Sequence, residues 1–83
     1  MFSVEIYRSA QKQLARIERS AAPRIVDAIR GLASDPRPAN VKKLAGRPAW
    51  RIRVGDYRVI YEIHDQRLVV LVIDIGHRRE VYR

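Results

Sequence analysis

Three arginines lie close together in residues 50–61, on either side of a glycine that can form a tight turn. If Gly55 takes the first central position of a two-residue turn, the segment folds as a β-hairpin in which Arg53 faces Arg58. Side chains alternate along a strand, so Arg51, Arg53 and Arg58 share one face of this hairpin. Opposed like charges destabilise a strand pair by up to roughly 1 kcal/mol, so folding alone gives no reason for the arrangement. A guanidinium stays charged near neutral pH and donates paired hydrogen bonds to phosphates, so the pattern predicts a face that binds an anion.

The other face of the same hairpin is apolar. In the predicted register Val54 faces Tyr57 and Ile52 faces Val59, and the apolar face comprises Trp50, Ile52, Val54, Tyr57, Val59 and Tyr61. Aromatic rings can stack on nucleic-acid bases, but their parity places these rings on the face that helices would cover. Packing in the core is therefore the role predicted for them.

A second set of candidate residues occurs at residues 77–82, with the sequence His-Arg-Arg-Glu-Val-Tyr. Cleavage of RNA by its own 2′-hydroxyl requires a base for that hydroxyl, stabilisation of the charge on the phosphorane, and an acid for the leaving 5′-oxygen. Arg78 could stabilise the charge, and Tyr82 could act as the base because neighbouring cations favour a phenolate. The imidazole of His77 could serve as acid or base. The alternative is a frayed basic terminus without chemistry.

The charge balance indicates a negatively charged partner. The chain has 17 basic and 9 acidic residues, with a formal net charge of +8. Residues 42–58 contain one acidic residue, Asp56, and the basic residues Lys42, Lys43, Arg47, Arg51, Arg53 and Arg58. RNA, DNA, an anionic membrane or an acidic protein would each satisfy this charge, and charge alone does not choose between them.

Several classes of protein are excluded by what the sequence lacks. There is no cysteine, which excludes a disulfide framework and a thiolate zinc site. No Ser-His-Asp, P-loop, Rossmann or metal-ligand spacing is present, so neither a metal nor a cofactor is expected. The N-terminal apolar run contains Glu5 and does not resemble a signal peptide, and the longest apolar run, residues 68–73, is too short to cross a membrane. A cytoplasmic location without a membrane partner is therefore predicted.

The spacing of apolar residues predicts the elements that would hold these candidates. Residues 2–7 alternate as a strand, an amphipathic helix follows with Ser9 as its N-cap and ends near Ser20, and a second helix runs from Pro23 until Asp35. A basic connector at residues 41–48 leads to the hairpin, and residues 67–75 form a last strand that is apolar on both faces and therefore central. The prediction is one α+β domain over residues 1–83, with the order β-α-α-β-β-β and an antiparallel sheet that carries an αα-hairpin on one face. The arginines would lie on the other, open face.

The sequence resembles the RelE branch of the RelE/ParE toxin superfamily. The resemblance rests on Lys43-Leu44, on Trp-Arg-Ile-Arg-Val-Gly-Asp-Tyr-Arg-Val-Ile-Tyr at residues 50–61 and on Ile-Gly-His-Arg-Arg-Glu-Val-Tyr at residues 75–82, and it covers nearly the whole chain. RelE toxins cut messenger RNA in the ribosomal A site without a metal. In them the 2′-hydroxyl attacks and leaves a cyclic phosphate and a 5′-hydroxyl.

The resemblance assigns roles to individual residues. The two strand lysines of the family fall on Arg51 and Arg53, its strand arginine on Arg58, its tail arginine on Arg78 and its tail tyrosine on Tyr82. Arginine does not transfer protons near neutral pH, so the change from lysine confines positions 51 and 53 to phosphate binding. The predicted catalytic residues are Arg58, Arg78 and Tyr82, with His77 as the alternative base. The predicted RNA-binding residues are Arg51, Arg53, Lys43, Arg47, His77 and Arg79.

The predicted function is therefore that of a type II toxin, a ribosome-dependent and metal-independent endoribonuclease (an mRNA interferase) that inhibits translation. Its predicted partners are messenger RNA on the ribosome, with contacts to ribosomal RNA, and a cognate RelB-like antitoxin. An acidic segment of that antitoxin would cover the arginines in a toxin–antitoxin hetero-oligomer. One alternative is a ParE-like toxin that inhibits DNA gyrase by protein contact and has no nuclease site. Another is a basic RNA-binding module without catalysis.

Overall fold

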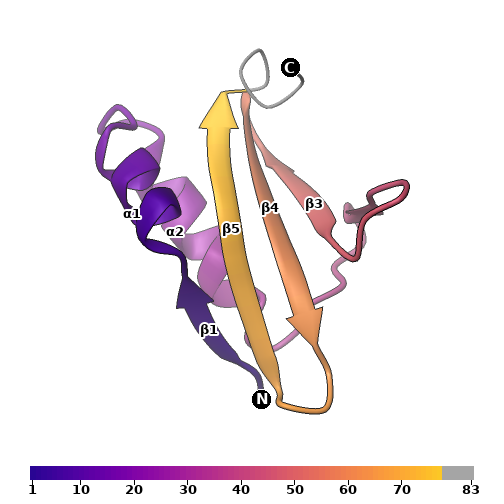
Figure 1. The fold of residues 1–83 in the computed structure, drawn as a ribbon. Coiled ribbons are helices and arrows are strands. Elements are labelled where there is room, and N and C mark those ends of the chain that lie inside the picture. Colours follow the sequence, from indigo (N-terminus) through magenta and orange to yellow (C-terminus); the bar gives the residue numbers. More distant parts are fainter. Residues whose placement is uncertain (78–83) are drawn as a thin grey trace.

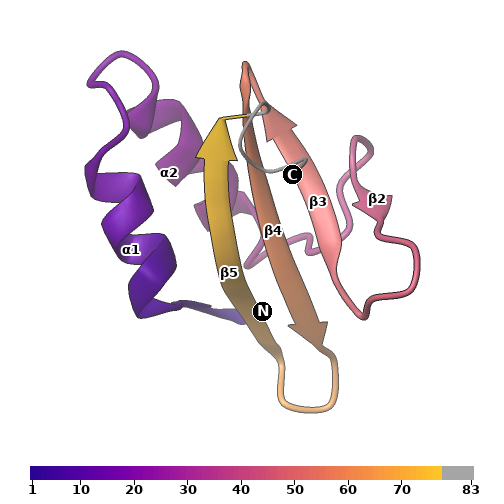
Figure 2. The same cartoon turned by 45° about the horizontal axis from the view of Figure 1, so that its top comes forward.

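The computed structural model describes residues 1–77 (Figure 1). The elements in chain order are β1 (Ser3–Ile6), α1 (Arg8–Ala15), α2 (Ala22–Gly31), β2 (Lys42–Lys43), β3 (Trp50–Val54), β4 (Tyr57–His64) and β5 (Val69–His77). The strands form one sheet, and both helices lie on the same side of it (Figures 1 and 2). The predicted α+β class is confirmed.

The sheet is mixed, with the strand order β1-β5-β4-β3-β2. β1 pairs with β5 in parallel, whereas the other neighbouring strands are antiparallel, so the prediction of a fully antiparallel sheet is wrong at this one pair. Hairpins join β3 to β4 and β4 to β5, and a hairpin makes its strands antiparallel. No hairpin joins β1 to β5, so their relative direction depends on the path through both helices. β5 has a strand on each side, as predicted for a strand that is apolar on both faces.

The hairpin of β3 and β4 has the predicted register. Val54 pairs with Tyr57, Arg53 with Arg58 and Ile52 with Val59. Gly55 adopts a φ of +60°, in the left-handed region that glycine occupies without steric cost. The short strand β2 was not predicted, because two strand residues in a basic connector give no detectable alternation.

Both helices differ from their predicted bounds. α1 begins at Arg8, so Ser9 lies inside the helix and is not its N-cap, and the helix ends at Ala15 rather than near Ser20. The last turn tightens, since the Arg16 and Ile17 amides donate to carbonyls three residues earlier. α2 has Pro23 in its first turn, as predicted, and ends at Gly31.

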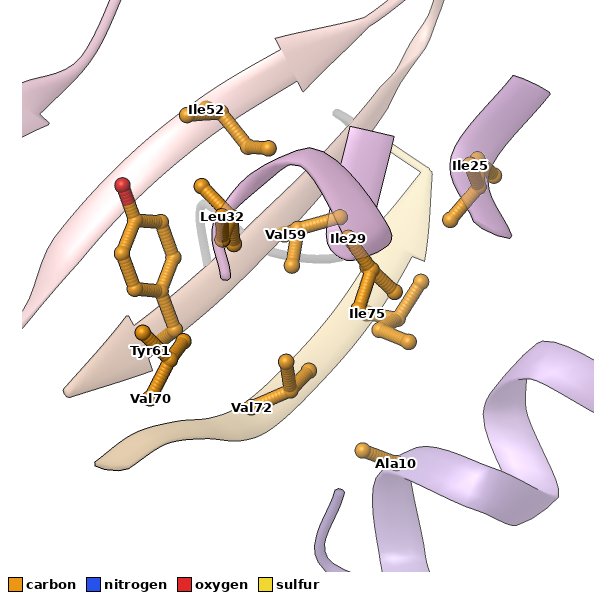
Figure 3. Packing of buried hydrophobic residues seen from close by; sticks show 10 residues of the cluster. All are labelled: Ala10, Ile25, Ile29, Leu32, Ile52, Val59, Tyr61, Val70, Val72 and Ile75. Carbon is orange, nitrogen blue, oxygen red and sulfur yellow. The ribbon is translucent and has the colours of Figure 1, made fainter. Parts of the chain in front are cut away.

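The core lies between the helices and the apolar face of the sheet. Figure 3 shows Ile25 and Ile29 of α2, with Leu32 just beyond it, together with buried side chains from the strands. The buried cluster comprises Ala10, Ile25, Ile29, Leu32, Ile52, Val59, Tyr61, Val70, Val72 and Ile75. The apolar hairpin face is therefore in the core as predicted, with Trp50, Val54 and Tyr57 packed against this cluster.

Tyr61 ties the sheet to the loop that follows α2. Its hydroxyl donates a hydrogen bond of 2.7 Å to the Pro36 carbonyl, and burial raises the pKa of the phenol to about 12. In the same loop, Arg37 forms an ion pair of 2.9 Å with Asp65, and its guanidinium lies 5.1 Å from the centre of the Trp50 ring. These contacts hold the loop that leads into β2.

We expect Tyr61→Phe to lower the free energy of unfolding by about 0.5–1.5 kcal/mol at pH 8, because the Pro36 carbonyl loses its donor. A raised pKa means that the stability from the protonated phenol is complete below the ordinary value of 10.0 and is lost as the pH rises through about 12. Urea unfolding between pH 8 and pH 12 should therefore show the gap between wild type and Tyr61→Phe closing above pH 10. Tyr57→Phe, on the same face of the hairpin, is the matched control. A gap that stays constant to pH 12 would contradict the prediction.

Candidate functional site

The sheet face opposite the helices carries a row of cations. Arg53 pairs with Arg58 across the hairpin, and on the other side of β3, Arg51 pairs with Lys42 of β2. Because paired residues in neighbouring strands point to the same side of a sheet, these four cations share the face that the helices do not cover. We call Lys42, Arg51, Arg53 and Arg58 the arginine face.

The sequence predicted that the arginine face is open to solvent. The structure shows that it is open only in part. Arg58 is 1% exposed and Arg51 is 9% exposed, whereas Arg53 is exposed. Arg58 and Arg51 are each paired on both sides by neighbouring strands. Arg53 lies beyond the end of β2, and there the Asn40 side chain donates to its backbone carbonyl at 3.4 Å. The two opposed arginines thus differ, one buried within the structure and one open to solvent.

The position of Arg58 combines burial with an unfavourable neighbour. Its partner on β5 is Gly76, which has no side chain, and its partner on β3 is another arginine. Like charges directly opposite one another destabilise a strand pair, so this register has an energetic cost. The exposed guanidinium of Arg53 can donate paired hydrogen bonds to a phosphate.

Lys42 is a member of this face that the sequence did not identify, and Lys43 lies on the other side. Lys43 pairs with Trp50, and its ammonium lies 5.8 Å from the centre of the Trp50 ring and donates to the Arg47 carbonyl at 3.3 Å. The predicted RNA-binding residue Lys43 is thus held against an aromatic ring, away from the arginines. Arg47 itself lies exposed in the loop between β2 and β3. Only strand pairing at β2 distinguishes the two lysines, and no pattern in the sequence predicts that pairing.

His77 ends β5 on the face that carries the helices. It pairs with Tyr57, and the two rings meet edge to face with their centres 5.5 Å apart. A pocket of about 450 Å³ lies beside them, and its lining includes Gln13, Arg16 and Ile75. The structure therefore separates His77 from the arginine face, with which the sequence had grouped it. The predicted residues Arg78, Arg79 and Tyr82 lie outside the described residues.

Other polar groups of the described residues lie away from the arginine face or do not cluster. Glu62 and His64 form a pair at 2.9 Å on β4. Among residues 1–77, no group of three or more His, Cys, Asp or Glu side chains is placed to hold a metal ion. None of the helices in the same range is long and apolar enough to cross a membrane.

Comparisons with known proteins cover nearly the whole chain. Residues 4–82 match the model of a family described as the ParE toxin of the type II toxin–antitoxin system parDE. A curated relative from Methanocaldococcus jannaschii, described as putative toxin RelE1, is 27% identical over 86 residues, covering 99% of this chain and 96% of the relative. The archaeal RelE–RelB complex from Pyrococcus horikoshii contains a similar chain, with a TM-score of 0.83, 28% identity, and coverage of 93% of this chain and 94% of that one. The intact RelBE toxin–antitoxin complex of E. coli contains another, with a TM-score of 0.81, 25% identity, and coverage of 93% and 96%.

We expect Lys42→Ala to weaken binding of a short single-stranded RNA, used as a polyphosphate probe, more than Lys43→Ala does. Loss of one phosphate contact should reduce the slope of log affinity against log salt by about 0.7 in Lys42→Ala, whereas Lys43→Ala should keep the wild-type slope. Fluorescence anisotropy over a salt series measures both. Equal losses in the two variants would mean that the arginine face does not determine which lysine meets the RNA.

Proposed function

We propose that this chain, which belongs to the ParE toxin family of type II toxin–antitoxin systems and is a RelE-like toxin, is an endoribonuclease that cuts messenger RNA in the ribosomal A site. The observation that supports this most is the opposed pair Arg53 and Arg58 on the face that the helices leave uncovered. A fold that needs only stability has no use for two cations at this register. A substrate phosphate would offset their repulsion.

The proposed reaction uses the RNA's own 2′-hydroxyl as the nucleophile. A base removes the proton of this hydroxyl, the 2′-oxygen bonds to the adjacent phosphorus, and the bond from phosphorus to the 5′-oxygen breaks. An acid gives a proton to that 5′-oxygen, so the products are a 2′,3′-cyclic phosphate and a 5′-hydroxyl. Protein groups alone can supply the base, the acid and the charge stabilisation, so we propose that no metal takes part.

The roles follow from residue type and from position on the sheet. Exposed Arg53 and neighbouring Arg51 would anchor the RNA backbone, and Arg58 would stabilise the charge on the phosphorane together with Arg78. Tyr82 would act as the base. His77 becomes the weaker alternative, because the described register places it on the other face of the sheet.

The proposal includes the ribosome because the arginine face offers little surface on which bases could stack. Tyr61 is buried, and Trp50 and Tyr57 pack against the core on the opposite face. Without stacking, a small basic surface binds single-stranded RNA loosely and does not orient it. A ribosome would hold the codon in place and so supply the orientation on which much of the rate depends.

The proposed regulator is a cognate antitoxin with an acidic segment. The similar chains from Pyrococcus horikoshii and E. coli are named as complexes of RelE with RelB. An acidic segment laid over the arginine face would pair with the cations that RNA needs and would exclude RNA from them. We propose such a hetero-oligomer as the silenced, cytoplasmic form of this toxin.

A second candidate function is inhibition of DNA gyrase by protein contact, because the matching family model describes a ParE toxin. An inhibitor that acts by contact has no need of two arginines directly opposed on neighbouring strands. The arginine face therefore favours the nuclease.

We expect primer extension on messenger RNA to show cuts with the wild-type protein and translating ribosomes, and none without ribosomes. Arg78→Ala should lower cleavage at least about a hundredfold through loss of charge stabilisation, and Tyr82→Phe should do the same through loss of the base. Arg67→Ala, an exposed arginine beyond the end of β4, is the matched control and should cut like wild type.

The variants must remain folded for this test to count, which circular dichroism and thermal unfolding would establish. Unfolding of Arg78→Ala would make Arg78 a structural residue. A folded, antitoxin-free wild type that makes no cuts would remove the nuclease proposal and favour the gyrase alternative, which a supercoiling assay then examines.

A further inference from the structure

The side chain of Gln13 links α1 to the end of β5. Its amide nitrogen Nε2 donates to Oδ1 of Asp74 at 2.7 Å, and its oxygen Oε1 accepts a hydrogen bond of 2.8 Å from the Ile75 backbone amide. Both ends of one side chain are therefore used on two consecutive residues of β5. Both hydrogen bonds are partly buried, which keeps water from replacing them readily.

These bonds occur beyond the point where the pairing of β1 with β5 ends. β1 pairs with β5 only as far as Ile6 opposite Val72, and the Tyr7 amide donates to the Val72 carbonyl as the chain turns into α1. From there to His77, the described residues pair with β5 only from β4 on the inner side, and the register shifts between Ile60 and Tyr61 of β4. A strand edge without a partner leaves backbone groups that need hydrogen bonds. Gln13 supplies the acceptor for the Ile75 amide, a role that a further residue of β1 would have if that strand were longer.

This part of β5 lies beside Arg58, a residue of the proposed active site. Gly76, the residue after Ile75, pairs with Arg58, and Arg78 follows three residues after Ile75 in the sequence. A shift of the β5 end would therefore move Gly76 relative to Arg58, which is a residue of the proposed active site. Misplacement of catalytic groups by about 1 Å can lower a rate by a hundredfold.

We infer that Gln13 is a positioning residue, which fixes the end of β5 against α1 and thereby sets the geometry of the proposed active site. The inference rests on the proposed nuclease function. It differs from a general stabilising role, because a helix packed on a sheet by apolar contacts keeps the fold without this amide. Ala10, one turn earlier in α1, is fully buried and supplies such contacts.

The chemistry of the amide permits a polarity-reversal test. In Gln13→Glu the carboxylate can still accept from Ile75, but it cannot donate and it repels the Asp74 carboxylate. In the double variant Gln13→Glu/Asp74→Asn, the new asparagine donates to the glutamate, so the bond between residues 13 and 74 is restored with donor and acceptor exchanged. The Ile75 amide still donates to residue 13, as it does in wild type. Asp74→Asn alone keeps an oxygen that accepts from Gln13, so it is the matched control.

We expect Gln13→Glu to lower kcat for ribosome-dependent cleavage by about tenfold to a hundredfold with KM changed less than about twofold, since RNA binding by the arginine face is retained. The double variant should recover most of the rate, and Asp74→Asn should stay within about threefold of wild type. Amide hydrogen exchange should show faster exchange at Ile75 in Gln13→Glu only, with β3 and β4 unchanged.

The remaining outcomes each overturn either the positioning role of Gln13 or the proposed nuclease function. Wild-type kcat in a folded Gln13→Glu, a loss of rate that only follows the loss of folded protein, or no recovery in the double variant would overturn the positioning role. If wild type itself does not cut, the nuclease proposal fails, and the exchange data alone decide this inference. Unchanged protection at Ile75 in Gln13→Glu would then overturn it, and faster exchange reversed by Asp74→Asn would support it.

Discussion

The register of the hairpin formed by β3 and β4 is the constraint on which the rest of the structure depends. A shift of one residue would move every side chain of a strand to the opposite face. The left-handed conformation of Gly55 fixes the turn, and the turn sets Ile52 and Val59 in the core while Arg53 and Arg58 lie on the far side. One glycine thus determines both the packing of the helices and the composition of the arginine face.

The two faces of the sheet impose opposite energetic requirements. Burial of an aliphatic side chain such as Ile52 contributes about 1.5–3 kcal/mol, whereas the opposed arginines detract from pairing of the same two strands. The core can carry this cost because the helix-facing residues of β4 and β5 are buried in one cluster with residues of both helices; from the strands they are Val59, Tyr61, Val70, Val72 and Ile75. Cations retained at some expense to stability are where function is expected. In the proposed function, the same cations would bind both the RNA and the acidic segment of the antitoxin.

The contact from α1 to β5 matters because the pairing of β1 with β5 ends at Val72. The second half of β5 lies beyond the reach of β1, so a helix side chain takes over part of the role of a strand. α1 in this way does more than cover the core, since it also holds the strand end next to Arg58. The proposed active site therefore depends on a helix that contributes no residue to the arginine face.

The sequence by itself determined the hairpin, its register, the core face and the arginine face, because turn chemistry and a two-residue alternation are local properties. Pro23 correctly indicated the start of α2. For α1 the sequence pattern predicted too long a helix and the wrong N-cap, Ser9, because fraying and tight turns override weak helix propensities. Only the tertiary structure decided that β1 runs parallel to β5, that Lys42 rather than Lys43 joins the arginines, and that Arg58 is buried. The same holds for the link from Gln13 to Asp74, 61 positions apart in the chain. Each of these depends on which distant segments pair, and no local pattern of residues encodes that choice.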